Sequence, residues 1–171
     1  MKLSKELILD VTESLIIKQG FETTTLSSVS KMLNVSHAAI YKYYSNKEDV
    51  FENLALRWIS RMFDHLFTWQ PNNSESPLHD WLWLLATTKK DLYLENPYMF
   101  NLYNEYIEKN SHLIKSHLES LYTKSESLDG KKNGYAVVNA FAIFHNPNFC
   151  DTWSRLSYQE DFEKIWELIS R

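Results

Sequence analysis

Long stretches of this sequence place apolar residues at helical spacing, and very little interrupts them. The 171 residues contain only three glycines and four prolines, the two residue types that most often break a helix. One stretch runs Phe51, Leu54, Trp58, Met62 and Leu66, at intervals of three or four, so these side chains lie on one face of a single helix. The pattern therefore predicts an all-α fold with a real hydrophobic core.

Nine helices are expected from these patterns and from the signals at their ends. They cover about residues 4–19, 26–33, 37–43, 47–69, 77–94, 97–109, 111–124, 135–145 and 157–170. Gly20 ends the first helix, and Phe21 is expected to fold back onto Ile16. Residues 70–77 and 125–134 are the expected loops. The predicted N-caps are Thr25, Ser36 and Asn46, with a capping box at Ser157 and Glu160.

Several classes of protein are disfavoured by the composition and by missing motifs. No apolar run approaches the roughly 20 residues needed to cross a bilayer, and the charged, amphipathic N-terminus is unlike a signal peptide. The single cysteine, Cys150, cannot form an internal disulfide, which fits a cytoplasmic location. HExxH, CxxC, EF-hand and GxSxG patterns are all missing from the sequence. We therefore expect no enzyme, no metal site, no cofactor and no membrane partner.

The stretch VSHAAIYKYYSNKED, from Val35 to Asp49, has too few aliphatic residues for a buried helix and too little charge for an ordinary surface helix. Two short helices here are joined by a tight turn at Asn34, a residue that tolerates positive φ. Their inner face is expected to hold Val29, Leu33, Val35 and Ile40. This arrangement predicts a helix-turn-helix. Spacing alone leaves a second interpretation open, because two short helices and a turn also occur in ordinary cores.

The outer face of the second short helix has the chemistry of a DNA-reading surface. Its small side chains at Ala38 and Ala39 let the backbone approach base edges in the major groove. Tyrosine, serine and lysine side chains can donate hydrogen bonds to phosphates. Lys47 and the amides of the next helix add a further phosphate site. The outer face comprises Ser36, His37, Ala38, Ala39, Tyr41 and Lys42.

Residues 1 to about 54 resemble the N-terminal DNA-binding domain of tetracycline-repressor (TetR) family regulators. The resemblance rests on ILDVTESLIIKQGFETTTLSSVS, on LNVSHAAIYKYYSNKED and on their mutual spacing. Two positions depart from the family pattern, Asn34 at the usual turn glycine and Ser30 at the usual alanine, and neither abolishes the turn. Tyr44 stands where the family usually has phenylalanine, so its ring is expected in the core.

The resemblance implies a helix-turn-helix domain over residues 1–46 and a helical regulatory and dimerisation domain over residues 47–171. It implies a ligand-responsive, sequence-specific transcriptional regulator, expected to be a repressor, that binds a palindromic operator in double-stranded DNA as a homodimer. The expected DNA-binding residues are Thr25, Ser27, Ser36, His37, Ala38, Ala39, Tyr41, Lys42, Tyr43 and Lys47.

The C-terminal part is rich in aromatic residues, most of which are best interpreted as core. A minority can line a pocket for a small apolar or aromatic ligand, and the candidates are Trp58, Met62, Tyr103 and Phe144. The last two long helices carry more apolar surface than one thin domain can bury, which predicts a homodimer. The expected interface residues are Ala136, Ala140, Phe162, Ile165, Trp166 and Ile169.

The charge distribution bears on how DNA would be read. Residues 1–50 carry six lysines and six acidic residues, so DNA binding has to rely on a few placed groups. Residues 1–56 contain no arginine, the residue that most often reads guanine. We therefore expect operator half-sites that are A·T-rich under Ala38 and Ala39, whose methyl groups suit thymine. Two alternatives stay open: a TetR-like helical interaction protein without DNA binding, and a small helical enzyme or ligand carrier.

Overall fold

The computed structural model describes residues 2–170, and every regular element among them is a helix, which confirms the all-α prediction. The chain forms two compact units. Unit 1 contains the chain up to Met62 together with residues 96–111, and unit 2 contains residues 63–95 together with the chain from His112 onward. Helix α4 (Lys47–Thr68) contributes its first turns to unit 1 and its last turns to unit 2.

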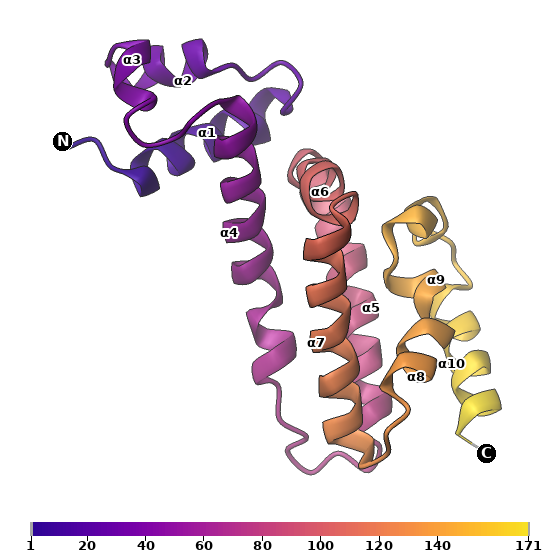
Figure 1. Ribbon diagram of the computed structural model, residues 1–171. Helices are drawn as coiled ribbons and strands as arrows, with labels where there is room; N and C mark the ends of the chain where they lie inside the picture. The colour runs from indigo at the N-terminus through magenta and orange to yellow at the C-terminus, as the bar shows by residue number, and fades with distance from the viewer. Residues whose placement is uncertain (1, 171) are drawn as a thin grey trace. The chain divides into compact units, whose positions relative to one another are not determined.

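Unit 1 places two short helices at one end of a longer pair (Figure 1). The longer pair is α1 (Lys5–Gln19) and the first part of α4, and the short helices are α2 (Leu26–Leu33) and α3 (His37–Ile40). A returning segment, α6 (Pro97–Tyr103) followed by the π-helical turn η1 (Asn104–Glu108), completes the unit and packs on α1. The predicted helix over residues 97–109 is therefore divided in two.

Side-chain caps set the starts of three helices in unit 1, as predicted. The Thr25 hydroxyl accepts from the amide of Ser28 at 3.1 Å, and the Ser36 hydroxyl accepts from the amide of Ala39 at 3.2 Å. The Asn46 side chain accepts from the amide of Asp49 at 2.7 Å. Asn34, between α2 and α3, has φ of 53°, which confirms the left-handed turn expected there.

One detail of unit 1 differs from the prediction. Helix α3 ends at Ile40 rather than Tyr43, because the hydroxyls of Tyr43 and Tyr44 donate to the carbonyls of Leu3 and Lys5 and hold this segment in a turn. Tyr44 is buried, as predicted. The ring of Phe21 packs edge-on against Phe51 and Tyr106, with ring centres 6.4 Å from each; its expected contact with Ile16 stays a prediction.

One arginine joins α1 to α4. The Arg57 guanidinium donates to the carboxylates of Glu6 at 2.9 Å, Asp10 at 2.8 Å and Glu13 at 2.8 Å, and its side chain is only 16% exposed. The three acids lie at spacings of four and three, so α1 turns them all to one face. Glu13 is as buried as the arginine, whereas Glu6 and Asp10 are exposed, so the pair with Glu13 is the one most shielded from water.

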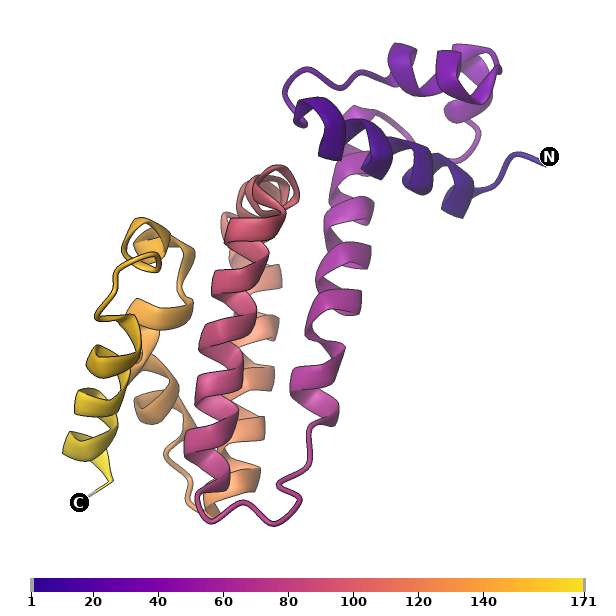
Figure 2. The same cartoon turned by 180° about the vertical axis from the view of Figure 1, so that it is seen from behind.

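Unit 2 packs α5 (Pro77–Glu95) beside α7 (Ser111–Asp129), with the shorter C-terminal helices along one side (Figures 1 and 2). The shorter helices are α8 (Gly134–Ala140), α9 (Ala142–His145), the 3-10 helix η2 (Pro147–Thr152) and α10 (Tyr158–Ile169). The core is aromatic, and its fully buried rings include Trp81, Phe141, Trp153 and Phe162.

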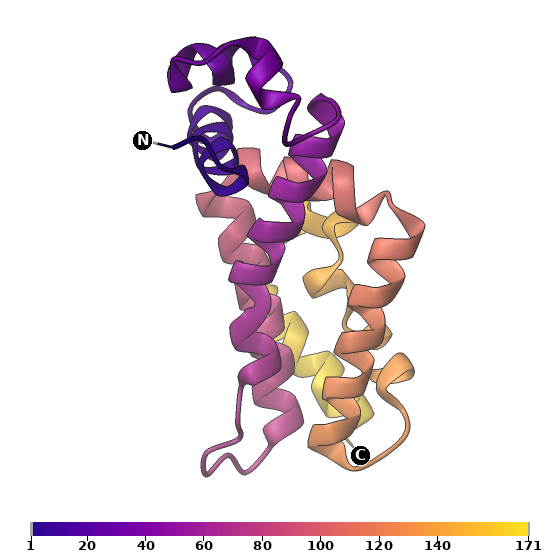
Figure 3. The same ribbon diagram turned by 60° about the vertical axis from the view of Figure 1, so that its left-hand side comes forward.

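After α7 the chain turns sharply, and α8 folds back beside it (Figure 3). Gly134 makes this close approach possible, since a Cβ on it would lie 2.3 Å from the carbonyl oxygen of Tyr122. The ring of Tyr135 packs on that of Tyr122 at 5.5 Å, and the Asn139 amide donates to the Tyr122 hydroxyl. Helix α7 also runs to Asp129, so the predicted loop over residues 125–134 is shorter than expected.

The predicted helix over residues 135–145 is broken at Phe141. The His145 ring donates through Nε2 to the carbonyl of Val138 at 2.9 Å, and so occupies an acceptor that a continuous helix would give to residue 142. The predicted capping box at Ser157 and Glu160 is also wrong: the Ser157 hydroxyl donates to Asp161 instead.

Replacing Arg57 with alanine is expected to lower the free energy of unfolding by about 1–3 kcal/mol, because three carboxylates would lose their common partner. Arg61→Ala is the matched control, since Arg61 is more exposed and pairs with Glu13 alone. Urea unfolding of both variants at neutral pH measures the difference. Equal losses for the two variants would contradict the central role of Arg57.

His145 gives unit 2 a defined sensitivity to acid. Its burial, aided by the positive charge of Lys89, lowers its pKa from 6.5 to about 4 despite the hydrogen bond to Val138. Above pH 6.5 the ring is neutral in both states and has no effect. As the pH falls from 6.5 to 4, the histidine binds a proton in the unfolded chain but stays neutral in the folded chain. The free energy of unfolding therefore falls, by about 3 kcal/mol in total.

His145→Gln keeps a donor for Val138 but cannot titrate. Urea unfolding between pH 7.5 and pH 4 should therefore give a flatter loss of stability than in the wild type. His79, whose pKa is raised, has no contribution from His145 and titrates alike in both proteins, so the difference between the two curves reports His145 together with its electrostatic effect on His117, whose pKa burial lowers well below its usual value. Parallel curves would contradict this assignment.

Candidate nucleic-acid interface

The pair α2 and α3 is held together from the inside. Val29 and Ile40 are fully buried, and Leu33 and Val35 are half-buried, as the predicted inner face requires. The amide of Val35 donates to the carbonyl of Ser30 at 3.0 Å, which closes the turn. The left-handed Asn34 reverses the chain within this turn, so α3 lies across α2 with its opposite face turned outward.

Most of the residues expected to contact DNA are exposed on or beside the outward face of α3. Along α3, the His37 ring packs edge-on against Tyr41 at 5.1 Å, which orients both rings on the surface. Ala39, Tyr43 and Lys47 are half-buried. The exposed members of the set are Thr25, Ser27, Ser36, His37, Ala38, Tyr41 and Lys42.

Two members of the set have partners inside unit 1. The Tyr43 hydroxyl donates to the carbonyl of Leu3 at 2.9 Å, so its hydrogen is already used and we leave Tyr43 out of the proposed phosphate contacts. The Lys47 ammonium lies 4.8 Å above the centre of the Phe51 ring, a cation–π contact that positions the charge at the start of α4. A phosphate can still approach that charge from solvent.

The cationic groups of this surface are lysines. Arg57, the first arginine in the chain, is paired with three acids of α1, so its guanidinium is not available to contact DNA. Lys42 is exposed on the segment that follows α3. The surface therefore offers methyl, hydroxyl and imidazole groups suited to base edges, and lysines suited to phosphates.

The four candidate ligand-binding residues pack inside the units that contain them. Within unit 1, Trp58 and Tyr103 are buried, with ring centres 6.3 Å apart, and Met62 is half-buried. Within unit 2, Phe144 is buried against Tyr158 and Phe162, at 5.2 and 5.3 Å. A role for these four residues in ligand binding stays a prediction.

The residues expected at a dimer interface divide into exposed and buried groups. Ala136, Ala140 and Ile169 are exposed, while Ile165 and Trp166 are half-buried. Phe162 is fully buried against Phe141 at 4.8 Å inside unit 2, so we leave it out of the proposed interface.

Sequence reasoning missed three large apolar side chains near these positions. Tyr135 is 69% exposed, Leu168 is 70% exposed and Ile143 is 39% exposed. Tyr135, Ala136, Ala140 and Ile143 lie at helical spacing, so the signal was present in the sequence.

Within residues 2–170, histidine, cysteine, aspartate and glutamate side chains nowhere gather in a group of three suited to a metal ion. Over the same residues, no helix has both the length and the apolar character needed to cross a bilayer.

The fold and the outward face of α3 are those of a helix-turn-helix domain. Residues 8–54 match the model of the family described as bacterial regulatory proteins, tetR family. The match lies within the N-terminal part of the chain and supports a TetR-family transcriptional regulator.

Known proteins of this kind resemble the chain over more than the matched segment. It is 25% identical over 120 residues to IcaR, the HTH-type negative transcriptional regulator of the biofilm operon icaADBC in Staphylococcus epidermidis, a match that covers 70% of this chain and 63% of IcaR. The chain thus spans less than two thirds of that relative.

Two solved structures share the fold at lower identity. BioQ with its double-stranded DNA operator superimposes with a TM-score of 0.66 at 14% identity, over 97% of each chain. FadR from Bacillus subtilis in complex with stearoyl-CoA gives a TM-score of 0.60 at 17% identity, over 96% of this chain and 97% of FadR.

Lys42→Ala is expected to weaken binding to all DNA sequences alike and to reduce the slope of log affinity against log salt by about one, because one phosphate contact is lost. Lys164→Ala, an exposed lysine on α10, is the matched control and should leave the slope unchanged. Fluorescence anisotropy with labelled duplex DNA at several salt concentrations measures both. An unchanged slope for Lys42→Ala would show that this face does not meet phosphate.

Proposed function

We propose that this protein is a ligand-responsive repressor that binds a palindromic operator as a homodimer, with residues 1–46 as its DNA-binding domain and residues 47–171 as its regulatory and dimerisation domain. The observation that carries the proposal is the exposed face of α3, small at Ala38 and polar at Ser36 and Lys42, within the segment that matches the TetR family. IcaR is a negative regulator by name, and BioQ was solved with an operator, which supports repression through DNA binding.

The proposed base readout follows from what the surface offers. The Ala38 methyl group is exposed and suits the C5-methyl of thymine, and His37 can reach a neighbouring base edge. A guanine-reading arginine is not available, because Arg57 is committed to α1. We infer A·T-rich positions under Ala38 and Ala39, and at most one strongly read guanine in each half-site.

The proposed dimer forms through the stripe made by Tyr135, Ala136, Ala140 and Ile143, together with the exposed end of α10. An obligate interface buries on the order of 2,000 Å² or more and is rich in apolar groups. The large exposed side chains at Tyr135 and Leu168 support this surface, since a monomer would leave them in water. The small Ala136 and Ala140 allow two helices to approach closely.

The proposed response to a ligand depends on α4. This helix is continuous from Lys47 to Thr68, and Arg57 binds it to α1, so a displacement of its later turns is transmitted to the DNA-binding helices. Induction requires a ligand whose affinity differs between the DNA-competent and relaxed states. FadR was solved with stearoyl-CoA, which supports a ligand with a large apolar part, and the ligand of this protein is proposed only to be apolar or aromatic.

Selection from a random DNA pool tests the proposal directly. The wild type should enrich a palindrome, since a two-fold symmetric dimer places two recognition helices on equivalent half-sites. A consensus with several invariant guanines in each half-site would contradict the inferred readout. No enrichment at all would contradict sequence-specific DNA binding.

Ala140→Glu places a charge in the proposed interface at an exposed position, so the fold of unit 2 should survive. This variant should sediment as a monomer at micromolar concentration and should lose binding to the selected palindrome, because each half-site alone binds weakly. Ser120→Glu, at an exposed position of α7, is the control and should stay dimeric. A dimeric Ala140→Glu variant would place the interface elsewhere.

A further inference from the structure

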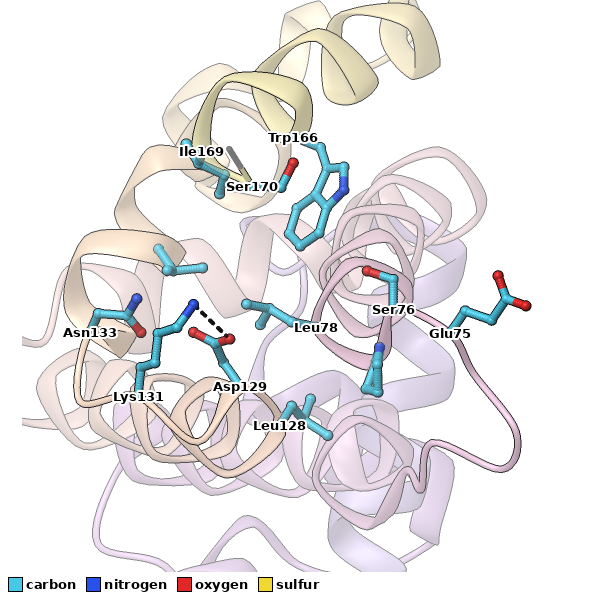
Figure 4. A pocket seen from close by; sticks show the side chains of 12 residues that line it. Glu75, Ser76, Leu78, Leu128, Asp129, Lys131, Asn133, Trp166, Ile169 and Ser170 are labelled. Atoms are coloured by element: carbon cyan, nitrogen blue, oxygen red, sulfur yellow. Dashed lines mark ion pairs between the residues drawn. The ribbon is translucent and has the colours of Figure 1, made fainter.

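A cleft of about 280 Å³ lies within unit 2, where four helices have their ends (Figure 4). Helices α5 and α8 begin at the cleft, and α7 and α10 end there. Part of its wall is apolar, with the Trp166 indole extending over it from α10, while polar groups make up most of the accessible lining. The apolar lining consists of Leu78, Leu128, Val137, Trp166 and Ile169.

Polar groups gather on the side of the cleft formed by the end of α7 and the following turn. Asp129 is 20% exposed and pairs with Lys131 at 3.4 Å, while Lys131 itself is 71% exposed. The side-chain oxygen of Asn133, another lining group, is buried and accepts no hydrogen bond from the residues that the structure describes. A buried acceptor without a donor is destabilising, so a donor supplied by a ligand would be favoured.

The electrostatic setting of the cleft favours a cation. Both α7 and α10 direct their C-terminal ends, which carry partial negative charge, toward it. The positive N-terminal ends of α5 and α8 also lie there: Asp80 in the first turn offsets that of α5, and the Glu126 carboxylate accepts a hydrogen bond from the first amide of α8. Glu75 points away from the cleft in Figure 4, so Asp129 is the carboxylate available inside. Lys131 is the competing cation, and its exposure leaves it free to move away.

We propose that this cleft binds a small primary amine with an aromatic ring, with the ring against Trp166 and the ammonium donating to Asp129 and to the Asn133 oxygen. The ammonium supplies the donor that Asn133 lacks and replaces Lys131 as the partner of Asp129. The aromatic ring of the ligand stacks on the indole, over the apolar part of the wall, and occupies the rest of the cleft.

This site goes beyond the proposed function and does not rest on it. Amine binding can fail while operator binding stands, and the reverse also holds, because α2 and α3 contribute nothing to the cleft. The cleft does border α8 and α10, the helices proposed to form the dimer, so an amine bound there would contact Trp166 beside that surface.

Isothermal titration calorimetry of the full chain with three probes of similar shape tests the inference. The probes are 2-phenylethylamine, the neutral 2-phenylethanol and the anionic 3-phenylpropionate. The amine should bind with a dissociation constant on the order of 0.1–1 mM, as expected for so small a ligand, and more tightly than the alcohol, with the acid weakest.

Three variants locate the site. Asp129→Asn should weaken the amine by about tenfold and leave the alcohol unchanged, because only the charged hydrogen bond is lost. Lys131→Met should strengthen amine binding, because it removes the competing cation. Glu160→Gln, which removes an exposed carboxylate of α10 that pairs with Lys164, is the matched control and should change neither ligand.

Several results would overturn the proposal. The proposal is wrong if the acid binds as tightly as the amine, or if the amine gives no heat of binding. It is also wrong if Asp129→Asn leaves the affinity for the amine unchanged, or if Lys131→Met lowers it. Circular dichroism of each variant at the titration temperature verifies that the chain is folded, so that a loss of binding is not a loss of structure.

Discussion

The packing of α1 against α4 depends on one guanidinium group, that of Arg57. Three carboxylates on one face of α1 would repel one another if this group were missing, and they lie 2.8 to 2.9 Å from it. Helix α1 in turn carries the carbonyls that anchor Tyr43 and Tyr44 after α3. The segment after α3 is thus hydrogen-bonded to the start of the chain and α1, and α1 is ion-paired to α4.

Because Arg57 is paired with the acids of α1, it is not available to contact DNA bases. The N-terminal domain is electrically neutral over residues 1–50 and has no arginine to place against guanine, so the proposed readout of DNA uses small and hydroxyl-bearing groups. In that proposal, affinity for phosphate comes from a few lysines and from the doubled contact of a dimer. The neutral composition is compatible with the proposal because the exposed methyl, hydroxyl and lysine groups lie together on and beside α3.

In unit 2, two features set the path of the chain after α7: the close approach of α8 to α7 at Gly134, and the buried His145. Gly134 lets α8 pass within contact of the α7 backbone, and His145 takes the Val138 carbonyl and divides one helix into α8 and α9. These two features leave Tyr135, Ala140 and Ile143 facing outward, and they bring the helix ends together around the cleft beneath Trp166.

The sequence by itself determined the all-α class, the caps at Thr25, Ser36 and Asn46, the left-handed Asn34 and the family of the N-terminal domain. Each of these depends on residues within a few positions of one another, where backbone geometry and spacing are sufficient. Only the tertiary structure decided the role of Arg57, the internal bond of Tyr43, the break at Phe141 and the burial of Phe162. All of these depend on partners that are distant in the chain or on which side of a helix faces the core, and local pattern does not specify either.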